Sequence, residues 1–305
     1  MKKKKTTLPW EHPKLEEEDP KSLELIKKIM QSPTYAMAES DEEFMNSYEA
    51  RGIRLELDYL KAELKMKEYG IEHTIVVFGS ARIVERATAL KRLKLIEEML
   101  DKHPNDRAIL KELYIAERMV EKSIYYDDAR EFGKLVGKSG KEIADCRVTL
   151  MTGGGPGIME AANRGAYDVG AKSIGLNIKL PHEQYPNPYI TPDLCFLFHY
   201  FAIRKLHFLN RAKALVVYPG GFGTFDELFE TLTLIQTYKT EQIPVVLVGK
   251  SYWQKAINFE FLQEEGVIAP EDLEIFYFAD DANEAWEHIL SWHKREGKPL
   301  FDEME

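Results

Sequence analysis

The sequence predicts an α/β protein in which a doubly wound, mostly parallel sheet carries helices on both faces. Short apolar runs, beginning with residues 74–79, alternate with longer stretches whose apolar residues recur at helical spacing. Two of these runs end in glycine-rich segments, residues 153–157 and 219–224, and a helical pattern follows each segment. In parallel sheets, such strand–glycine–helix junctions lie at the edge where ligands bind.

The expected elements follow in chain order. Residues 1–72 are polar, contain several prolines and show helical periodicity, so we expect a helical N-terminal extension. We expect the α/β domain to span residues 73–296 and a short tail to occupy residues 297–305. The expected strands are residues 74–79, 147–152, 173–178, 195–198, 214–218 and 243–249, with a short edge strand at 274–278. The helices expected between them include residues 158–170, 253–265 and 282–295.

Composition and charge exclude several classes of function. The 305 residues are 44% hydrophobic, which is typical of a globular protein with a full core. The formal charge of −10 disfavours nucleic acid as a partner but allows a small anion at a local site. No apolar run follows the four lysines of residues 2–5, and none reaches membrane-spanning length, so we expect a cytoplasmic protein without a membrane partner. Cys146 and Cys195 are expected to be reduced thiols.

The segment at residues 219–224 is the strongest candidate for a ligand site. Its glycines and its threonine are Gly220, Gly221, Gly223 and Thr224. Glycine lets the backbone approach a ligand closely, and a helix that begins here offers free N–H groups and a positive dipole end to a phosphate. Glu227 follows about one turn later. Alternatively, Thr224 is an N-cap with Glu227 as its capping-box partner, which explains these two residues but not the glycines.

The earlier segment at residues 153–157 repeats this arrangement. Its candidate binding residues are Gly154, Gly155, Gly157 and Glu160. We expect Glu160 to accept hydrogen bonds from ribose hydroxyls, although it is alternatively an acid favoured by the positive end of a helix dipole. Neither segment matches the GxGxxG dinucleotide fingerprint, and no P-loop with the correct spacing is present in the sequence.

Further candidates lie between and before the two glycine segments. Arg204 and Lys205 stand side by side in a mainly apolar helical stretch, where they are either solvated or directed at an anion. Arg204 is the better candidate, because its planar guanidinium matches a phosphate or a carboxylate. Ser80 and Arg82 follow the first strand at the same edge of the sheet and are expected to reach the ligand, the alternative being an ordinary strand-end turn.

Together, the two glycine motifs resemble those of the LOG (LONELY GUY) family over about residues 74–290. The resemblance implies a Rossmann-like phosphoribohydrolase that cleaves AMP or a cytokinin riboside monophosphate to free base and ribose 5-phosphate. It implies Arg204 and Glu227 as catalytic residues, no metal or redox cofactor, and a homodimer or larger homo-oligomer. Relative to short members of the family, residues 1–72 and roughly residues 84–123 are extra, so we expect a helical insertion after the first strand.

Two other functions remain open at this point. A non-catalytic nucleotide or cofactor carrier on the same fold would bind its ligand without turnover. A lysine decarboxylase is the second alternative, because residues 291–294 (Ser-Trp-His-Lys) superficially resemble a pyridoxal-phosphate site. These four residues lie far in the sequence from both glycine segments, which makes this the weaker alternative.

Overall fold

The computed structural model describes residues 13–14, 17–140, 147–181, 185–298 and 300. The chain divides into two compact units, Met1–Leu57 and Asp58–Glu305. The first unit contains α1 (Ser22–Met30), α2 (Glu42–Asn46) and the beginning of α3 (Arg51–Glu68), so the predicted helical character of the N-terminal extension is confirmed. The predicted division into functional domains after residue 72 stays a prediction.

The second unit is built on a parallel sheet, as the sequence predicts. Seven strands within the described ranges form it in the order β4-β3-β2-β1-β5-β6-β7. They are β1 (His73–Phe78), β2 (Val148–Thr152), β3 (Ser173–Ile178), β4 (Cys195–Phe198), β5 (Ala212–Val217), β6 (Val245–Val248) and β7 (Phe276–Ala279). The chain winds outward from β1 through β4 and then returns to the other side of β1 at β5. The crevice between the carboxyl ends of β1 and β5 is therefore the switch point at which doubly wound sheets bind ligands.

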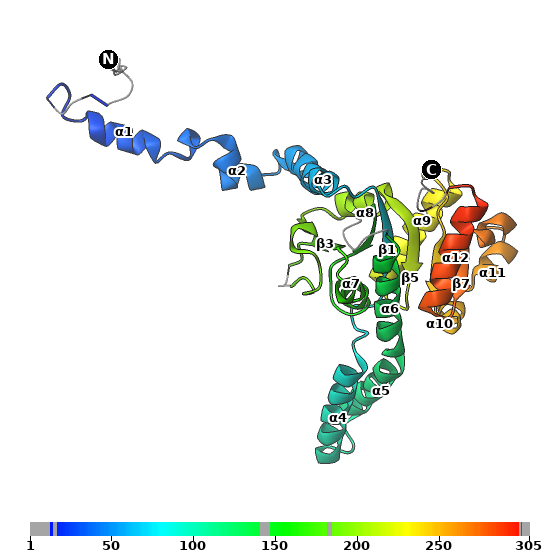
Figure 1. Cartoon of the computed structure of the whole chain (residues 1–305). Coiled ribbons are helices and arrows are strands. Elements are labelled where there is room, and N and C mark those ends of the chain that lie inside the picture. The colour runs from blue at the N-terminus through cyan, green and yellow to red at the C-terminus, as the bar shows by residue number, and fades with distance from the viewer. Residues whose placement is uncertain (1–12, 15–16, 141–146, 182–184, 299, 301–305) are drawn as a thin grey trace. The chain divides into compact units, whose positions relative to one another are not determined.

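Helices cover both faces of this sheet, and alternate residues of each strand point to opposite faces (Figure 1). On one face, Ile75 and Val77 of β1 pack in a core with α6 (Ile124–Lys138), α7 (Ile158–Asp168) and α12 (Ala282–Arg295). On the other face, Val76 and Phe78 belong to a second core. The helices of that core are α8 (Phe201–Asn210), α9 (Phe222–Gln236), α10 (Lys250–Ala256) and the end of α3.

A helical hairpin follows β1, which confirms the predicted insertion. It consists of α4 (Arg86–Lys102) and α5 (Arg107–Lys122), which share a small core of Ile96, Ile109 and Ala116. The side chain of Asp106 caps α5 by accepting hydrogen bonds from the N–H groups of Ala108 and Ile109, at 2.8 and 3.4 Å. This cap satisfies two of the donors that a helix start leaves free, so the turn between the two helices is well defined.

One predicted helix is wrong in its extent. Residues 253–265 were expected to form a single helix, but the chain forms α10 and then α11 (Phe259–Glu264). The break lies at Asn258, whose side-chain oxygen accepts a hydrogen bond from the N–H of Phe261 at 3.0 Å and caps the second helix. Asparagine is a strong N-cap residue because its side chain replaces the missing backbone acceptor, and here that preference overrides the apolar periodicity.

Candidate active site

A cavity of about 960 Å³ lies at the carboxyl ends of the strands, over the switch point between β1 and β5. Its wall includes the turn after β1, residues 79–83, and the loop and first turn of α9, residues 219–225. Arg204 of α8 and Glu227 of α9 also line it. The structure therefore brings together the predicted residues Ser80, Arg82, Gly220, Gly221, Gly223, Thr224, Arg204 and Glu227.

The helix α9 begins at the cavity. Gly221 is its N-cap residue and Phe222 its first helical residue, so Thr224 already lies inside the first turn. No side chain caps this helix, and the alternative in which Thr224 is the N-cap of a capping box is therefore wrong. The first N–H groups of an uncapped helix have no partner within the helix and carry partial positive charge. This end of α9 can bind an anion placed in the cavity.

The glycines of this loop are not all explained by the fold. A methyl group on Gly221 or Gly223 would meet no atom within 4 Å, and neither residue has a positive φ angle. Neither steric packing nor backbone conformation therefore requires glycine at these two positions. Both residues line the cavity, so the absent side chains leave space through which a ligand reaches the backbone.

The first glycine segment has a different environment. Gly157 has φ of +73°, and a methyl group there would stand 2.4 Å from the carbonyl oxygen of Ser80. A methyl group on Gly154, whose φ is +71°, would stand 2.3 Å from the side chain of Asn177. The residues Gly154, Gly155 and Gly157 are not among those that line the cavity. Close packing within the protein explains the glycines at residues 154 and 157, and the predicted ligand contacts of all three stay predictions. Gly153 of the same segment does line the cavity.

A buried hydrogen-bond network holds this first segment in place. Asn163 accepts a hydrogen bond from the hydroxyl of Thr152 at 2.7 Å and another from the side-chain amide of Asn187 at 3.0 Å. The same amide of Asn187 donates to the carbonyl oxygen of Gly155 at 3.1 Å. Asn163 and Thr152 are fully buried. Because each of these polar groups is satisfied by another, the network fixes the shape of the segment.

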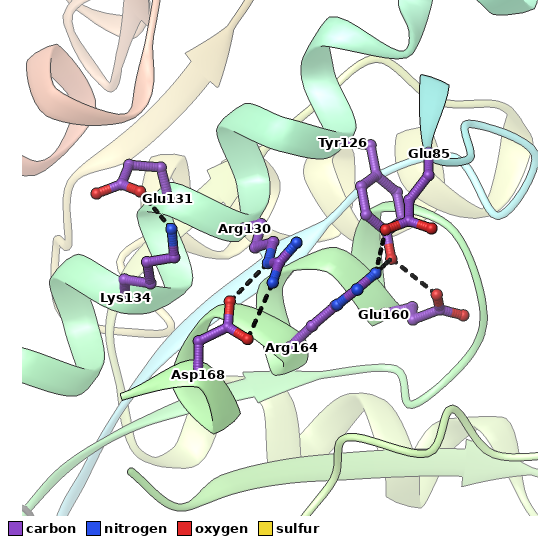
Figure 2. Close-up of polar contacts among 8 residues, drawn as sticks. All are labelled: Glu85, Tyr126, Arg130, Glu131, Lys134, Glu160, Arg164 and Asp168. Atoms are coloured by element: carbon purple, nitrogen blue, oxygen red, sulfur yellow. Dashed lines mark hydrogen bonds and ion pairs between the residues drawn. The ribbon is translucent and has the colours of Figure 1, made fainter. Parts of the chain in front are cut away.

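Glu160 follows the same segment but lies outside the cavity lining. It accepts a hydrogen bond from the hydroxyl of Tyr126 at 2.8 Å, and that hydroxyl also lies 3.5 Å from Arg164 (Figure 2). This hydrogen bond links Glu160 of α7 to Tyr126 of α6. The expected contact of Glu160 with ribose hydroxyls stays a prediction.

Ser80 connects the two glycine segments. Its N–H donates to the carbonyl oxygen of Pro219 at 3.0 Å, and its carbonyl oxygen accepts from the N–H of Ile158 at 3.1 Å. The first N–H of α7 is therefore already occupied, in contrast to the start of α9. The hydroxyl of Ser80 accepts from the N–H of Arg82 at 3.1 Å, which shapes the turn that carries the Arg82 side chain at the cavity.

Arg204 and Glu227 form a buried ion pair, with 3.5 Å between Nη2 and Oε1. Glu227 is 5% exposed, and Arg204 lies over the rings of Phe201 and Phe208 at 5.1 and 5.4 Å. The Nε atom of Arg204 is buried and has no hydrogen-bond partner within the described part of the chain. The Nη1 atom of Arg204 donates to the carbonyl oxygen of Leu176, also at 3.5 Å. These two long contacts do not use all five N–H donors of the guanidinium, so others can reach a ligand in the cavity.

Burial dominates the electrostatics of this pair. It raises the pKa of Glu227 to about 7, although the neighbouring Arg204 acts in the opposite direction. Burial also lowers the pKa of Arg204. A carboxyl group whose pKa lies near neutrality in a cavity is suited to accept and return a proton at physiological pH.

We expect the kcat of any reaction that needs the Glu227 carboxylate to rise about tenfold per pH unit below pH 7 and to level off above it. The sign follows because protonation of Glu227 at low pH removes the base. The profile should be measured at saturating substrate, since a phosphate monoester itself titrates near pH 6. A kcat that stays constant between pH 5 and 8 would contradict this assignment.

Lys205 does not face the cavity with its neighbour. Its ammonium pairs with Asp226 at 2.8 Å and with Glu230 at 3.0 Å, both on α9, and it is absent from the cavity lining. Successive side chains on a helix point about 100° apart, so Arg204 and Lys205 contact different residues of α9. The predicted anion contact of Lys205 stays a prediction, and the structure shows it joining α8 to α9.

Sequence reasoning missed several residues of the cavity. Tyr252 of α10 lines it and donates a hydrogen bond from its hydroxyl to the carbonyl oxygen of Gly220, which supports the α9 loop. Met119 and Lys122 of the insertion also line it. The signal for Tyr252 was available, because α10 directly follows β6 at the same edge of the sheet. The two residues of α5 depend on how the insertion folds back, which no local pattern specifies.

The remaining predictions concern metals, thiols and the decarboxylase alternative. No group of three His, Cys, Asp or Glu side chains gathers as a metal site in the described ranges, and no helix there is long and apolar enough to cross a membrane. Cys195 is a free thiol, whereas Cys146 lies outside the described residues. Lys294 is exposed on α12 and does not line the cavity.

Comparisons with known proteins find a matching family model and several relatives. Residues 159–289 match the model of a family described as possible lysine decarboxylase. Cytokinin riboside 5′-monophosphate phosphoribohydrolase LOG3 of Arabidopsis thaliana is 28% identical, and the match covers 61% of this chain and 85% of that protein. The corresponding LOG protein of Oryza sativa subsp. japonica is 27% identical over 56% of this chain and 69% of its own length.

Among solved structures, the molybdenum cofactor binding protein of Rippkaea orientalis is similar at 22% identity and a TM-score of 0.39, over 55% of this chain and 87% of that one. The sequence matches confirm the resemblance that the two glycine-rich motifs indicate: the α/β part of this chain is similar to LOG-family phosphoribohydrolases.

Proposed function

We propose that this protein hydrolyses the N-glycosidic bond of a nucleoside 5′-monophosphate, AMP or a cytokinin riboside monophosphate, to the free base and ribose 5-phosphate. The observation that carries the proposal is the buried Arg204–Glu227 pair, which lines the same cavity as the uncapped start of α9. The phosphate binds at the start of α9, beside Gly221 and Gly223, and its attachment there positions the ribose for attack.

In this mechanism, the bond between C1′ and the base nitrogen breaks while positive charge develops on the ribose, as in glycoside hydrolysis. The Glu227 carboxylate stabilises that charge and takes a proton from the water whose oxygen attacks C1′. The base departs with the bonding electron pair and takes a proton from solvent, and Glu227 returns the proton that it accepted from the attacking water to solvent. Arg204 holds the Glu227 carboxylate through the 3.5 Å contact and directs its remaining N–H donors into the cavity.

The identity of the base is a further part of the proposal. The cavity lining includes apolar side chains that can pack against the faces of a planar base, among them Met159, Ile178, Leu180 and Phe201. Of these, Phe201 is 50% exposed and lies beside the Arg204 guanidinium. A purine, and AMP first, is the substrate to test.

The direct test is chromatographic. Purified protein is incubated with each common nucleoside monophosphate and with a cytokinin riboside monophosphate, and free base and ribose 5-phosphate are quantified together. Equal amounts of both products support the proposal. If no base is released from any of these nucleotides at high enzyme concentration, while AMP still binds, the protein is a carrier and the proposal fails.

A further inference from the structure

The helical insertion after β1 contributes side chains to the cavity. Met119 and Lys122 lie three residues apart in the last turn of α5, so they share one face of the helix, and both line the cavity. Lys122 is the more informative of the two because it carries a charge. The insertion is thereby part of the site itself.

Lys122 is a cation without a partner inside the described ranges. Its side chain is half-buried, and no hydrogen bond or ion pair joins its ammonium to another described residue. Burial, together with the nearby Arg118, lowers the pKa of Lys122, although Glu121 acts in the opposite direction without forming an ion pair with it. A partly dehydrated ammonium without a carboxylate is unfavourable until an anion approaches it.

Both ends of the insertion are fixed to the α/β domain. At its start, Glu85 forms an ion pair with Arg164 of α7 (Figure 2). At its end, the hydroxyl of the fully buried Ser123 donates to the carbonyl oxygen of Val120 at 2.7 Å. The backbone carbonyl oxygen of Ser123 accepts from the N–H of Tyr126 in α6 at 3.0 Å. Lys122 directly precedes this junction, so its backbone is positioned before any ligand arrives.

The charges of the cavity balance only when Lys122 is counted. Three cationic side chains, Arg82, Lys122 and Arg204, and one carboxylate, Glu227, line it, which gives a net charge of +2. A phosphate monoester carries about −1.5 to −2 at neutral pH. Without Lys122 the net charge of the lining would be +1, the charge of Arg82, because the charges of Arg204 and Glu227 cancel.

We propose that Lys122, supplied by the inserted helix α5, binds the phosphate of the substrate and makes the site selective for phosphorylated nucleosides. This inference rests on the proposed function for the identity of the substrate. It assigns to the insertion a direct role in binding, and it predicts that the charge of residue 122 matters more than its shape.

The test compares Lys122→Met with Lys122→Arg and with Lys111→Met. Lys111 is an exposed lysine of the same helix, eleven residues earlier, which places it on nearly the same face but about 16 Å farther along the helix axis and outside the cavity lining. We expect Lys122→Met to raise the KM and the Kd for AMP about 10- to 100-fold, with kcat changed only a few-fold, because an ion-assisted hydrogen bond is lost. Lys122→Arg and Lys111→Met should stay within a few-fold of the unaltered protein.

Calorimetric titration with AMP and with ribose 5-phosphate separates this inference from the proposed function, since it needs no turnover. If the protein releases no base but Lys122→Met still weakens binding of both ligands, the proposed reaction fails and the role of Lys122 stands. If Lys122→Met matches the unaltered protein, or if Lys122→Arg is as impaired as Lys122→Met, the inference is overturned. Equal thermal unfolding midpoints must accompany the comparison, and absence of binding by the unaltered protein overturns it as well.

Discussion

Replacement of Glu227 by glutamine is expected to lower kcat for nucleoside monophosphate hydrolysis by about 10²- to 10⁴-fold, the usual contribution of a positioned acid or base. Glutamine has nearly the same shape and still accepts a hydrogen bond from Arg204, so the buried contact at 3.5 Å is preserved in outline. What disappears is the negative charge and the ability to take a proton. We therefore expect the Kd for AMP to change only a few-fold, while base release almost stops.

Glu230→Gln is the matched control for this experiment. Glu230 lies one turn later on α9, pairs with Lys205 at 3.0 Å, and is not part of the cavity lining. The two variants remove the same charge from the same helix, but only one removes it from the cavity. Base release should be measured by chromatography alongside AMP binding. Turnover by Glu227→Gln at the rate of the control would show that this carboxylate does not take part in the chemistry.

The fold was predictable because its strands are buried on both faces. Runs such as residues 74–79 therefore consist almost entirely of apolar residues, and the glycines that end two of them mark the ligand edge. Arg204 and Glu227 could also be predicted, because each belongs to a short motif that is recognisable from neighbouring residues in the sequence. The structure places these two side chains in contact. The sequence did not specify the break between α10 and α11, where the capping preference of Asn258 competes with periodicity.

The candidate site was only partly predictable, because its residues acquire their roles through distant contacts. Both glycine segments have the same local pattern. The carbonyl oxygen of Ser80, however, accepts the hydrogen bond of the first N–H of α7, whereas no side chain caps the start of α9. Lys205 was grouped with Arg204, although neighbouring helical residues diverge by about 100° and could have been separated from the sequence alone. The position of Lys122 at the cavity depends on how the inserted helices pack, and residue spacing in the sequence does not specify that packing.

The contrast between the two glycine segments leads to a pair of substitutions with opposite effects. Gly223 lies in the first turn of α9, where alanine is a better helix former, so Gly223→Ala is expected to raise the free energy of unfolding by about 0.5–1 kcal/mol. Its methyl group meets no protein atom within 4 Å and enters the cavity instead. Gly223→Ala should therefore weaken AMP binding at least about tenfold, because it blocks access to the helix start.

Gly157→Ala is expected to act in the opposite way. Its φ of +73° with ψ of −128° is strained for any residue with a side chain, and the methyl group would stand 2.4 Å from the Ser80 carbonyl oxygen. The combined strain and overpacking should lower the free energy of unfolding by about 2–4 kcal/mol. Because Ser80 also holds Pro219, any loss of AMP binding should follow the loss of folded protein.

Denaturant unfolding and AMP titration of the two variants test whether the two glycine segments have separate roles. If Gly223→Ala destabilises the protein, the open space beside it is not part of a ligand site but serves the fold. If Gly157→Ala folds with normal stability and loses only AMP binding, the first segment serves the ligand site, either directly or through Ser80. The expected outcome is that a stabilised variant binds poorly, because glycine at residue 223 is retained for the ligand at a cost to the helix.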